Sequence, residues 1–231
     1  MFFIFIQLVS AFKTLEQFNF KLPVSEVKNE RNCNASYIFA STSALESSFY
    51  QNKILPNTTN LSDQYVLSIL EANCTGDTLE SAIKVLSTNG TTLESTYPYY
   101  GQGIYISSDK NMKYYISNYE NSSMNKSQFI QKLNTTTLIV RFRIDNIENL
   151  VNYDGESYYN CENLGNDVHY MLAVQYDSDS DIVYLKNNWG LGWGNAGYLL
   201  LSLNENNTTS NIGPCGIYQN VTWINEIRFE N

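Results

Sequence analysis

The sequence predicts an α+β fold, because two kinds of apolar pattern occupy different halves of the chain. Helical spacing prevails up to about residue 90, and runs of β-branched and aromatic residues prevail after residue 137. Hydrophobic residues make up 43% of the 231 residues and charged residues 16%, which suffices for a sizeable core. We therefore expect a helical lobe and a β-barrel-like lobe, with a site in the cleft between them.

The first eleven residues form an apolar run that ends in Val9, Ser10 and Ala11. Such a run before small residues is typical of a signal peptide. No Lys or Arg precedes it, so a hydrophobic first strand is the alternative. The run is too short to span a bilayer, and no other run in the sequence is long enough. We expect one domain over residues 12–231 in the secretory pathway, either extracellular or in a lysosome or vacuole.

The helical half begins after an extended arm, residues 12–35, which contains Pro23 and has no helical period. Loose helical spacing predicts a helix from Ser36 to Gln51. The hydroxyl of Ser36 suits its first turn, where it could cap free amides. Two further helices are expected over 61–72 and 78–88, the second ending at an Asn-Gly pair.

The second half contains four predicted strands and one short helix. The strands cover 137–143, 169–176, 182–186 and 197–203, and the helix lies near 126–133. The left, helical lobe is expected mainly over 30–115 and the right lobe mainly over 116–224. No repeat and no flexible linker separates them, and we expect a monomer.

Charge and composition argue against several classes of function. The net charge of −9 disfavours nucleic acid as a partner. The chain has no Gly-rich phosphate loop, and with His169 as its only histidine a zinc enzyme is hard to build. We expect no metal and no cofactor.

Four cysteines and many N-x-[ST] sequons favour the secretory route. An even set without CxxC spacing predicts disulfides rather than a metal site. The eleven sequons exceed what chance would give in a chain so rich in Asn, Ser and Thr. The cysteines are Cys33, Cys74, Cys161 and Cys215, and the sequons begin at Asn34, Asn57, Asn60, Asn73, Asn89, Asn121, Asn125, Asn134, Asn206, Asn207 and Asn220.

Seven segments in order resemble the landmarks of the papain and cathepsin family of cysteine peptidases. Residues 27–39 resemble V-K-N-Q-G-x-C-G-S-C-W-A-F, and residues 186–198 resemble K-N-S-W-G-x-x-W-G-x-x-G-Y. The others are 61–64 (L-S-E-Q), 74–77 (C-N-G-G), 94–99 (E-x-x-Y-P-Y), 168–169 (D-H or N-H) and 214–217 (C-G-I). The resemblance spans roughly residues 20–224 and implies the papain-like two-lobe fold.

The resemblance also implies roles for individual residues. His169 matches the catalytic base, Asn187 the residue that orients it, and Trp189 the residue that shields their hydrogen bond. Gly76 and Asp77 match the substrate-binding turn. It pairs Cys33 with Cys74 and Cys161 with Cys215, and the family's third bridge is absent, with Ile69 near one expected cysteine. A peptide or protein ligand would bind in the cleft.

Two departures fall on the catalytic machinery. Ser36 stands where the family has its nucleophilic cysteine, and Glu30 stands where it has the glutamine that binds the oxyanion. A serine hydroxyl does not ionise where a thiol does, and a carboxylate places negative charge where negative charge must develop. Arg31 and Asn34 replace glycines, and we expect Arg31 to form a salt bridge with Glu30.

Further changes agree with a loss of activity. Val168 replaces a polar residue, Asp77 replaces a glycine that lets substrate approach, and a glycan on Asn34 would obstruct the cleft. The sequence shows no inhibitory propeptide, for which an incomplete gene model is the alternative. We interpret the protein as a papain-like peptidase homologue that is inactive or strongly impaired. A serine peptidase with His169 as base, and a glycosylated surface or protein-binding module, are the alternatives.

Overall fold

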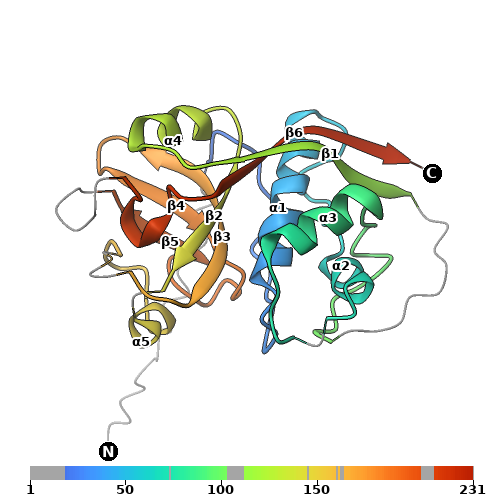
Figure 1. The fold of residues 1–231 in the computed structure, drawn as a ribbon, viewed down its shortest axis with the longest axis horizontal. Coiled ribbons are helices and arrows are strands. Elements are labelled where there is room, and N and C mark those ends of the chain that lie inside the picture. The colour runs from blue at the N-terminus through green and yellow to red at the C-terminus, as the bar shows by residue number, and fades with distance from the viewer. Residues whose placement is uncertain are drawn as a thin grey trace, which may run out of the picture.

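The structure is a computed structural model that describes residues 19–72, 74–102, 112–144, 146–159, 161, 164–203 and 211–230. Residues 1–11, where we expect a signal peptide, lie outside this range. The described chain contains helices α1–α3 on one side and most of an antiparallel sheet on the other (Figure 1). The α+β class expected from the sequence is confirmed.

The helical side is built around α1 (Ser36–Gln51), of which fifteen of sixteen residues are buried. A helix that is covered all round belongs to the core, and α1 carries small residues that let its neighbours approach. The helices α2 (Asp63–Ile69) and α3 (Leu79–Thr88) pack against it. Each begins at a capping hydroxyl, because Ser62 Oγ accepts from Tyr65 N and Thr78 Oγ1 from Ser81 N.

The start of α1 differs from the expectation. Its N-cap is Ala35, which makes no side-chain capping hydrogen bond. The Ser36 hydroxyl does not cap α1 either, because Oγ instead accepts from the backbone N–H of Tyr170, 3.2 Å away on a strand. A tertiary contact with the other side of the molecule has therefore replaced the expected local one.

The sheet has six strands in the order β1-β6-β2-β3-β4-β5, and every neighbouring pair is antiparallel. Its bounds are β1 (Lys113–Ser122), β2 (Leu138–Arg143), β3 (Val168–Asp177), β4 (Ile182–Lys186), β5 (Tyr198–Ser202) and β6 (Val221–Glu230). The pairing does not join β1 to β5, so the sheet is open and "barrel-like" describes it only loosely.

The sequence did not predict three of the elements. The strands β1 and β6 pair along their length and form a ribbon that runs from one side of the molecule to the other (Figure 1). Each has six residues at one end that are not buried; those of β1 are mostly polar, whereas those of β6 include Ile227 and Phe229. Helix α5 (Ile147–Val151) is too short to show a period. The expected helix near 126–133 is present as α4 (Lys126–Leu133), which has a capping box formed by Asn125 and Gln128.

Two hydrophobic cores underlie the two sides. One gathers around α1 and includes Ile38, Leu45 and Phe49, and the other lies against the sheet and includes Phe129 and Phe142. The first also encloses charge, because Lys28 Nζ lies 2.8 Å from carboxylate oxygens of both Glu46 and Asp63. Such a buried cluster is tolerated only while its charges remain paired.

Both disulfides expected from the resemblance are present. Cys33 is bonded to Cys74, and Cys161 to Cys215.

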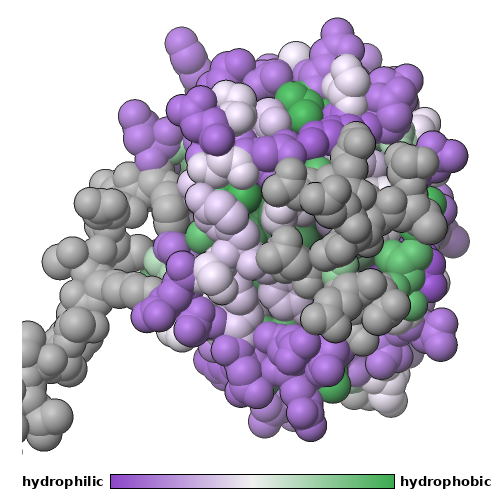
Figure 2. Space-filling model, turned by 90° about the vertical axis from the view of Figure 1, so that its left-hand side faces the viewer, coloured by the Kyte–Doolittle hydropathy of each residue, from purple (hydrophilic) through white to green (hydrophobic). Residues whose placement is uncertain are grey.

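The face turned to the viewer in Figure 2 is mainly hydrophilic, with scattered hydrophobic residues. Within the described ranges, no helix is both long enough and apolar enough to cross a bilayer.

Candidate active site

Ser36, His169 and Asn187 come from three elements that meet at the junction of the two sides. Ser36 begins α1, His169 is the second residue of β3, and Asn187 follows directly after β4. The antiparallel pairing of β3 with β4 brings His169 and Asn187 together, although they are 18 positions apart in the chain. All three side chains are largely buried.

The histidine is held by its neighbours on the sheet side. His169 Nε2 lies 2.7 Å from Asn187 Oδ1, which as an amide oxygen accepts the imidazole N–H. The Trp189 ring packs over the imidazole with centroids 4.8 Å apart. Burial lowers the pKa of His169 to about 4, against the opposing influence of its hydrogen bonds to Asn187 and Asn188. The imidazole is therefore neutral at neutral pH.

Ser36 faces the same strand. Its Oγ accepts a hydrogen bond from the amide of Tyr170, the residue after His169, and the residue is 8% exposed. In a papain-like thiolate–imidazolium pair the anion stabilises the cation. The neutral hydroxyl of Ser36 supplies no negative charge to stabilise an imidazolium. This agrees with a pKa of His169 that is lowered mainly by burial.

Glu30 also lies at this junction, between the start of α1 and Trp189. Glu30 Oε1 accepts from Trp189 Nε1 at 2.8 Å, and Oε2 accepts from the backbone N–H of Ala35 at 2.7 Å. The residue is 4% exposed. Burial raises the pKa of Glu30 to about 7, although both hydrogen bonds favour the carboxylate. The same side chain thus links the sheet side to the start of α1.

The salt bridge expected between Arg31 and Glu30 is absent among the described ion pairs. The Arg31 guanidinium lies 6.0 Å from the centre of the Tyr99 ring instead. Arg31 has φ 58°, a left-handed conformation that glycine adopts most readily. The backbone geometry that suits the family's glycine is therefore kept, with Asn29 Oδ1 accepting from Arg31 N at 2.8 Å.

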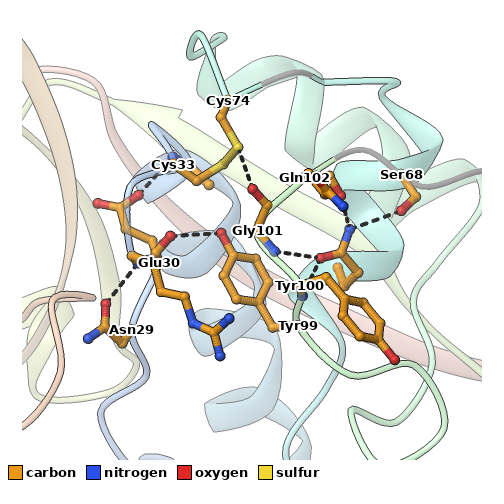
Figure 3. The surroundings of a disulfide bond; sticks show 12 residues. Asn29, Glu30, Cys33, Ser68, Cys74, Tyr99, Tyr100, Gly101 and Gln102 are labelled. Carbon is orange, nitrogen blue, oxygen red and sulfur yellow. Dashed lines mark hydrogen bonds between the residues drawn. A yellow bond between two sulfur atoms is a disulfide. The ribbon is translucent and has the colours of Figure 1, made fainter.

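The turn that carries Glu30 is fixed from both sides. Glu30 N donates to Asn188 O at 2.8 Å, and Tyr99 Oη donates to Glu30 O at 2.9 Å. Figure 3 shows this turn beside the Cys33–Cys74 disulfide and the segment of residues 99–102. Glu30 is consequently held at the junction by backbone as well as side-chain contacts.

Gly76 and Asp77 lie on the turn that follows Cys74. Gly76 has φ 88°, and a Cβ added there would lie 3.6 Å from the Cβ of Asn34. Asp77 is exposed, and its Oδ1 accepts from Thr78 N at 2.6 Å. Burial and, secondarily, the charge of Asp77 raise the pKa of Tyr37 to about 12, so Asp77 acts electrostatically on the first turn of α1.

Sequence reasoning missed several contacts of this site. Tyr170 holds the Ser36 hydroxyl, Tyr99 holds the Glu30 carbonyl, and Asn188 holds the Glu30 amide. The first pair is 134 positions apart in the chain and the second 69. Each of the three contacts uses at least one backbone atom, which residues of many types could supply, so no local signal could have found them. Among the described residues, no cluster of His, Cys, Asp and Glu is arranged to hold a metal ion.

Comparison with known families decides the relationship. The model of the family described as "Papain family cysteine protease" matches residues 15–224. The chain belongs to the papain family of cysteine proteases. A viral cathepsin of Epiphyas postvittana nucleopolyhedrovirus is 27% identical over 88% of this chain and 62% of its own length. Zingipain-2 of Zingiber officinale is 29% identical over 84% of this chain and 88% of its own. Testin-2 of Mus musculus is 28% identical over 84% of this chain and 60% of its own.

The solved papain-family structures agree in fold. A cysteine protease of Carica candamarcensis in complex with E-64 superposes with a TM-score of 0.72 at 24% identity, over 88% of this chain and 94% of that one. Bromelain from Ananas comosus, also in complex with E-64, gives 0.72 at 24% identity over 87% and 94%. The chain spans 62% or less of the length of several curated relatives, so this family likeness establishes the domain and not the activity of a whole protein.

Proposed function

We propose that this protein is a papain-family homologue with absent or strongly impaired peptidase activity, whose interlobe cleft binds a peptide or protein segment without cleaving it. The observation that carries the proposal is the Glu30 carboxylate, which accepts hydrogen bonds from Trp189 and Ala35. It stands at the position where a papain-family peptidase has the side-chain donor of its oxyanion hole.

The electrostatics of that position oppose amide hydrolysis. An oxyanion hole works because fixed donors face the charge that develops in the transition state, and losing one donor costs about 10²–10³ in kcat. An ionised Glu30 donates nothing and adds repulsion. Its two acceptor atoms already serve Trp189 and Ala35, so the local contacts favour keeping it as an acceptor.

The nucleophile and base add a second obstacle. The Ser36 hydroxyl must lose its proton during attack, and the base best suited to take it has a pKa near the operating pH. Burial lowers the pKa of His169 to about 4, which makes this imidazole a weak proton acceptor. In this proposal the hydroxyl of Ser36 and the imidazole of His169 are poorly matched in proton affinity.

One observation favours the alternative, a serine peptidase in which His169 takes the proton from Ser36. The pKa of Glu30 is raised to about 7, so below that pH its neutral carboxyl could donate to an oxyanion. The lowered pKa of His169, about 4, keeps the imidazole neutral over the same range. The alternative therefore predicts activity confined to a window between about pH 4 and pH 7.

Fluorogenic peptides offered to the purified protein across roughly pH 4–8 separate the two functions. We expect no turnover above that of the Ser36→Ala variant at any pH. Turnover that follows the window and disappears in Ser36→Ala would establish the serine peptidase and refute the first proposal. In the third alternative, a glycosylated surface or protein-binding module, ligand binding would not depend on the cleft.

Binding in the cleft is tested separately with an array of immobilised peptides. We expect peptides retained by the protein to be lost in Asp77→Arg but kept in Glu226→Arg, an exposed site on β6. Binding that survives both substitutions would favour the surface-module alternative.

The two disulfides and the papain-family relatives support a place in the secretory pathway, extracellular or lysosomal.

A further inference from the structure

The sequons provide a test of whether sugar could be carried by the folded protein. Eight of the eleven sequon asparagines lie in the described ranges, and none of the eight is buried. Seven are exposed, namely Asn34, Asn57, Asn89, Asn121, Asn125, Asn134 and Asn220, and Asn60 is partly buried. A glycan adds bulk that only the surface can accommodate, and these seven residues meet that condition.

Asn34 differs from the other exposed sequon residues in its location. It lies two residues before Ser36, and its backbone N–H donates to Cys74 O at 3.3 Å. Its Cβ is 3.6 Å from where a Cβ on Gly76 would lie. Asn34 is therefore close both to Ser36 in the chain and to the turn of Gly76 and Asp77 in space.

Ser36 has a second chemical role in this segment. The acceptor pattern requires a hydroxyl residue two positions after the asparagine, and for Asn34 that residue is Ser36. The replacement that removes the thiol nucleophile therefore also completes a glycosylation site beside it. A cysteine at position 36 would not satisfy the N-x-[ST] pattern.

The burial of Ser36 is no obstacle, because the proposed transfer takes place on the chain before it folds. The Asn34 amide nitrogen bonds to the anomeric carbon of a polyprenyl-diphosphate-linked oligosaccharide. The bond from that carbon to the diphosphate oxygen breaks, the lipid diphosphate leaves, and one amide proton is lost. No oxidant or reductant is needed.

We propose that Asn34 is an N-glycosylation site whose glycan covers the region between Ser36 and the Gly76–Asp77 turn, and so restricts access to the catalytic position. The inference rests on the proposed function, because a working peptidase needs that surface for its substrate. Two separate effects would then oppose peptide cleavage. Glu30 would oppose it through its charge within the site, and the glycan would hinder access of the substrate to the site.

The test is site-specific mapping of the full chain secreted from insect cells behind a heterologous leader. Amidase release in heavy-oxygen water converts each glycosylated asparagine to a labelled aspartate, which mass spectrometry locates. We expect the label at position 34 in the native protein and in Ser36→Thr, and none there in Ser36→Ala. Asn89, exposed at the end of α3, serves as the internal control.

An unlabelled position 34 beside a labelled position 89 would overturn the inference, and so would a chain with no labelled position at all. Neither result bears on Glu30. Conversely, peptide turnover by glycan-free protein would refute the proposed function while the occupancy of Asn34 is measured independently. The two failures are therefore distinguishable.

Discussion

Replacing Glu30 with glutamine tests whether the buried carboxyl has the raised pKa that sets the pH range over which it is ionised. In the folded protein burial raises the pKa of Glu30 from 4.5 to about 7. The folded state thus retains a proton that the unfolded state releases above about pH 4.5. Stability from this group is complete at low pH and is lost as pH rises from about 4.5 to about 7.

The magnitude follows from the two pKa values. Each unit of pKa corresponds to about 1.4 kcal/mol, so ionising Glu30 in the fold costs about 3 kcal/mol in full and about 2.5 kcal/mol between pH 5 and pH 8. The glutamine introduced by Glu30→Gln would not titrate. Its single amide oxygen can accept from only one of Trp189 and Ala35, which costs about 1 kcal/mol at every pH.

We therefore expect Glu30→Gln to be slightly less stable than the native protein at pH 5 and about 1–2 kcal/mol more stable at pH 8. The change in the difference, about 2.5 kcal/mol, corresponds to roughly 5–10 °C in melting temperature for a domain of this size. Thermal unfolding followed by circular dichroism at both pH values measures it. Other titrating groups are common to both proteins and largely cancel.

The exposed Glu226→Gln on β6 is the matched control, because it makes the same substitution outside the buried junction. A raised pKa of Glu30 is refuted if the stability difference between Glu30→Gln and the native protein changes with pH no more than that of Glu226→Gln. It is equally refuted if the variant loses stability relative to the native protein between about pH 5 and pH 8, as a carboxylate stabilised in its ionised form would require.

Three further predictions concern the catalytic position, the buried charges and a disulfide. Glu30→Gln combined with Ser36→Cys should restore both a thiol and an oxyanion donor, and should therefore cleave peptides faster than Ser36→Cys alone. Equal cleavage rates in the two variants would contradict the role given to position 30. Lys28→Met should leave two buried carboxylates unpaired and lower the free energy of unfolding by about 3–5 kcal/mol, as measured by urea unfolding. A loss below about 1 kcal/mol would show that these ion pairs are exposed to solvent. Replacing both Cys33 and Cys74 with serine should lower the free energy of unfolding by about 4 kcal/mol, because the bridge joins residues separated by 41 positions. Urea unfolding under oxidising conditions measures the loss, and an unchanged unfolding midpoint would show that this disulfide does not stabilise the fold.

Local signals account for much of the fold. Ser36–Gln51 is predicted as a helix over the bounds that α1 has, and Ile182–Lys186 as a strand over those of β4. The strands β1 and β6 were not predicted, because each is stabilised by a partner distant in the chain. The end of β1 that is not buried is a mostly polar run without alternation, and the alternation in β6 covers only residues 226–230.

Side-chain identity is a local property, so the family register and the candidate residues at positions 30, 36, 169 and 187 could be recognised in the chain before folding was considered. The environment of these four residues could not be recognised in the same way. Folding gives Glu30 the partners Trp189 and Ala35 instead of Arg31, and gives the Ser36 hydroxyl the amide of Tyr170 instead of its own helix. Hydrogen-bond partners and desolvation depend on groups distant in the chain, and because these set the pKa values of Glu30 and His169, the chemistry of the site is a property of the folded molecule.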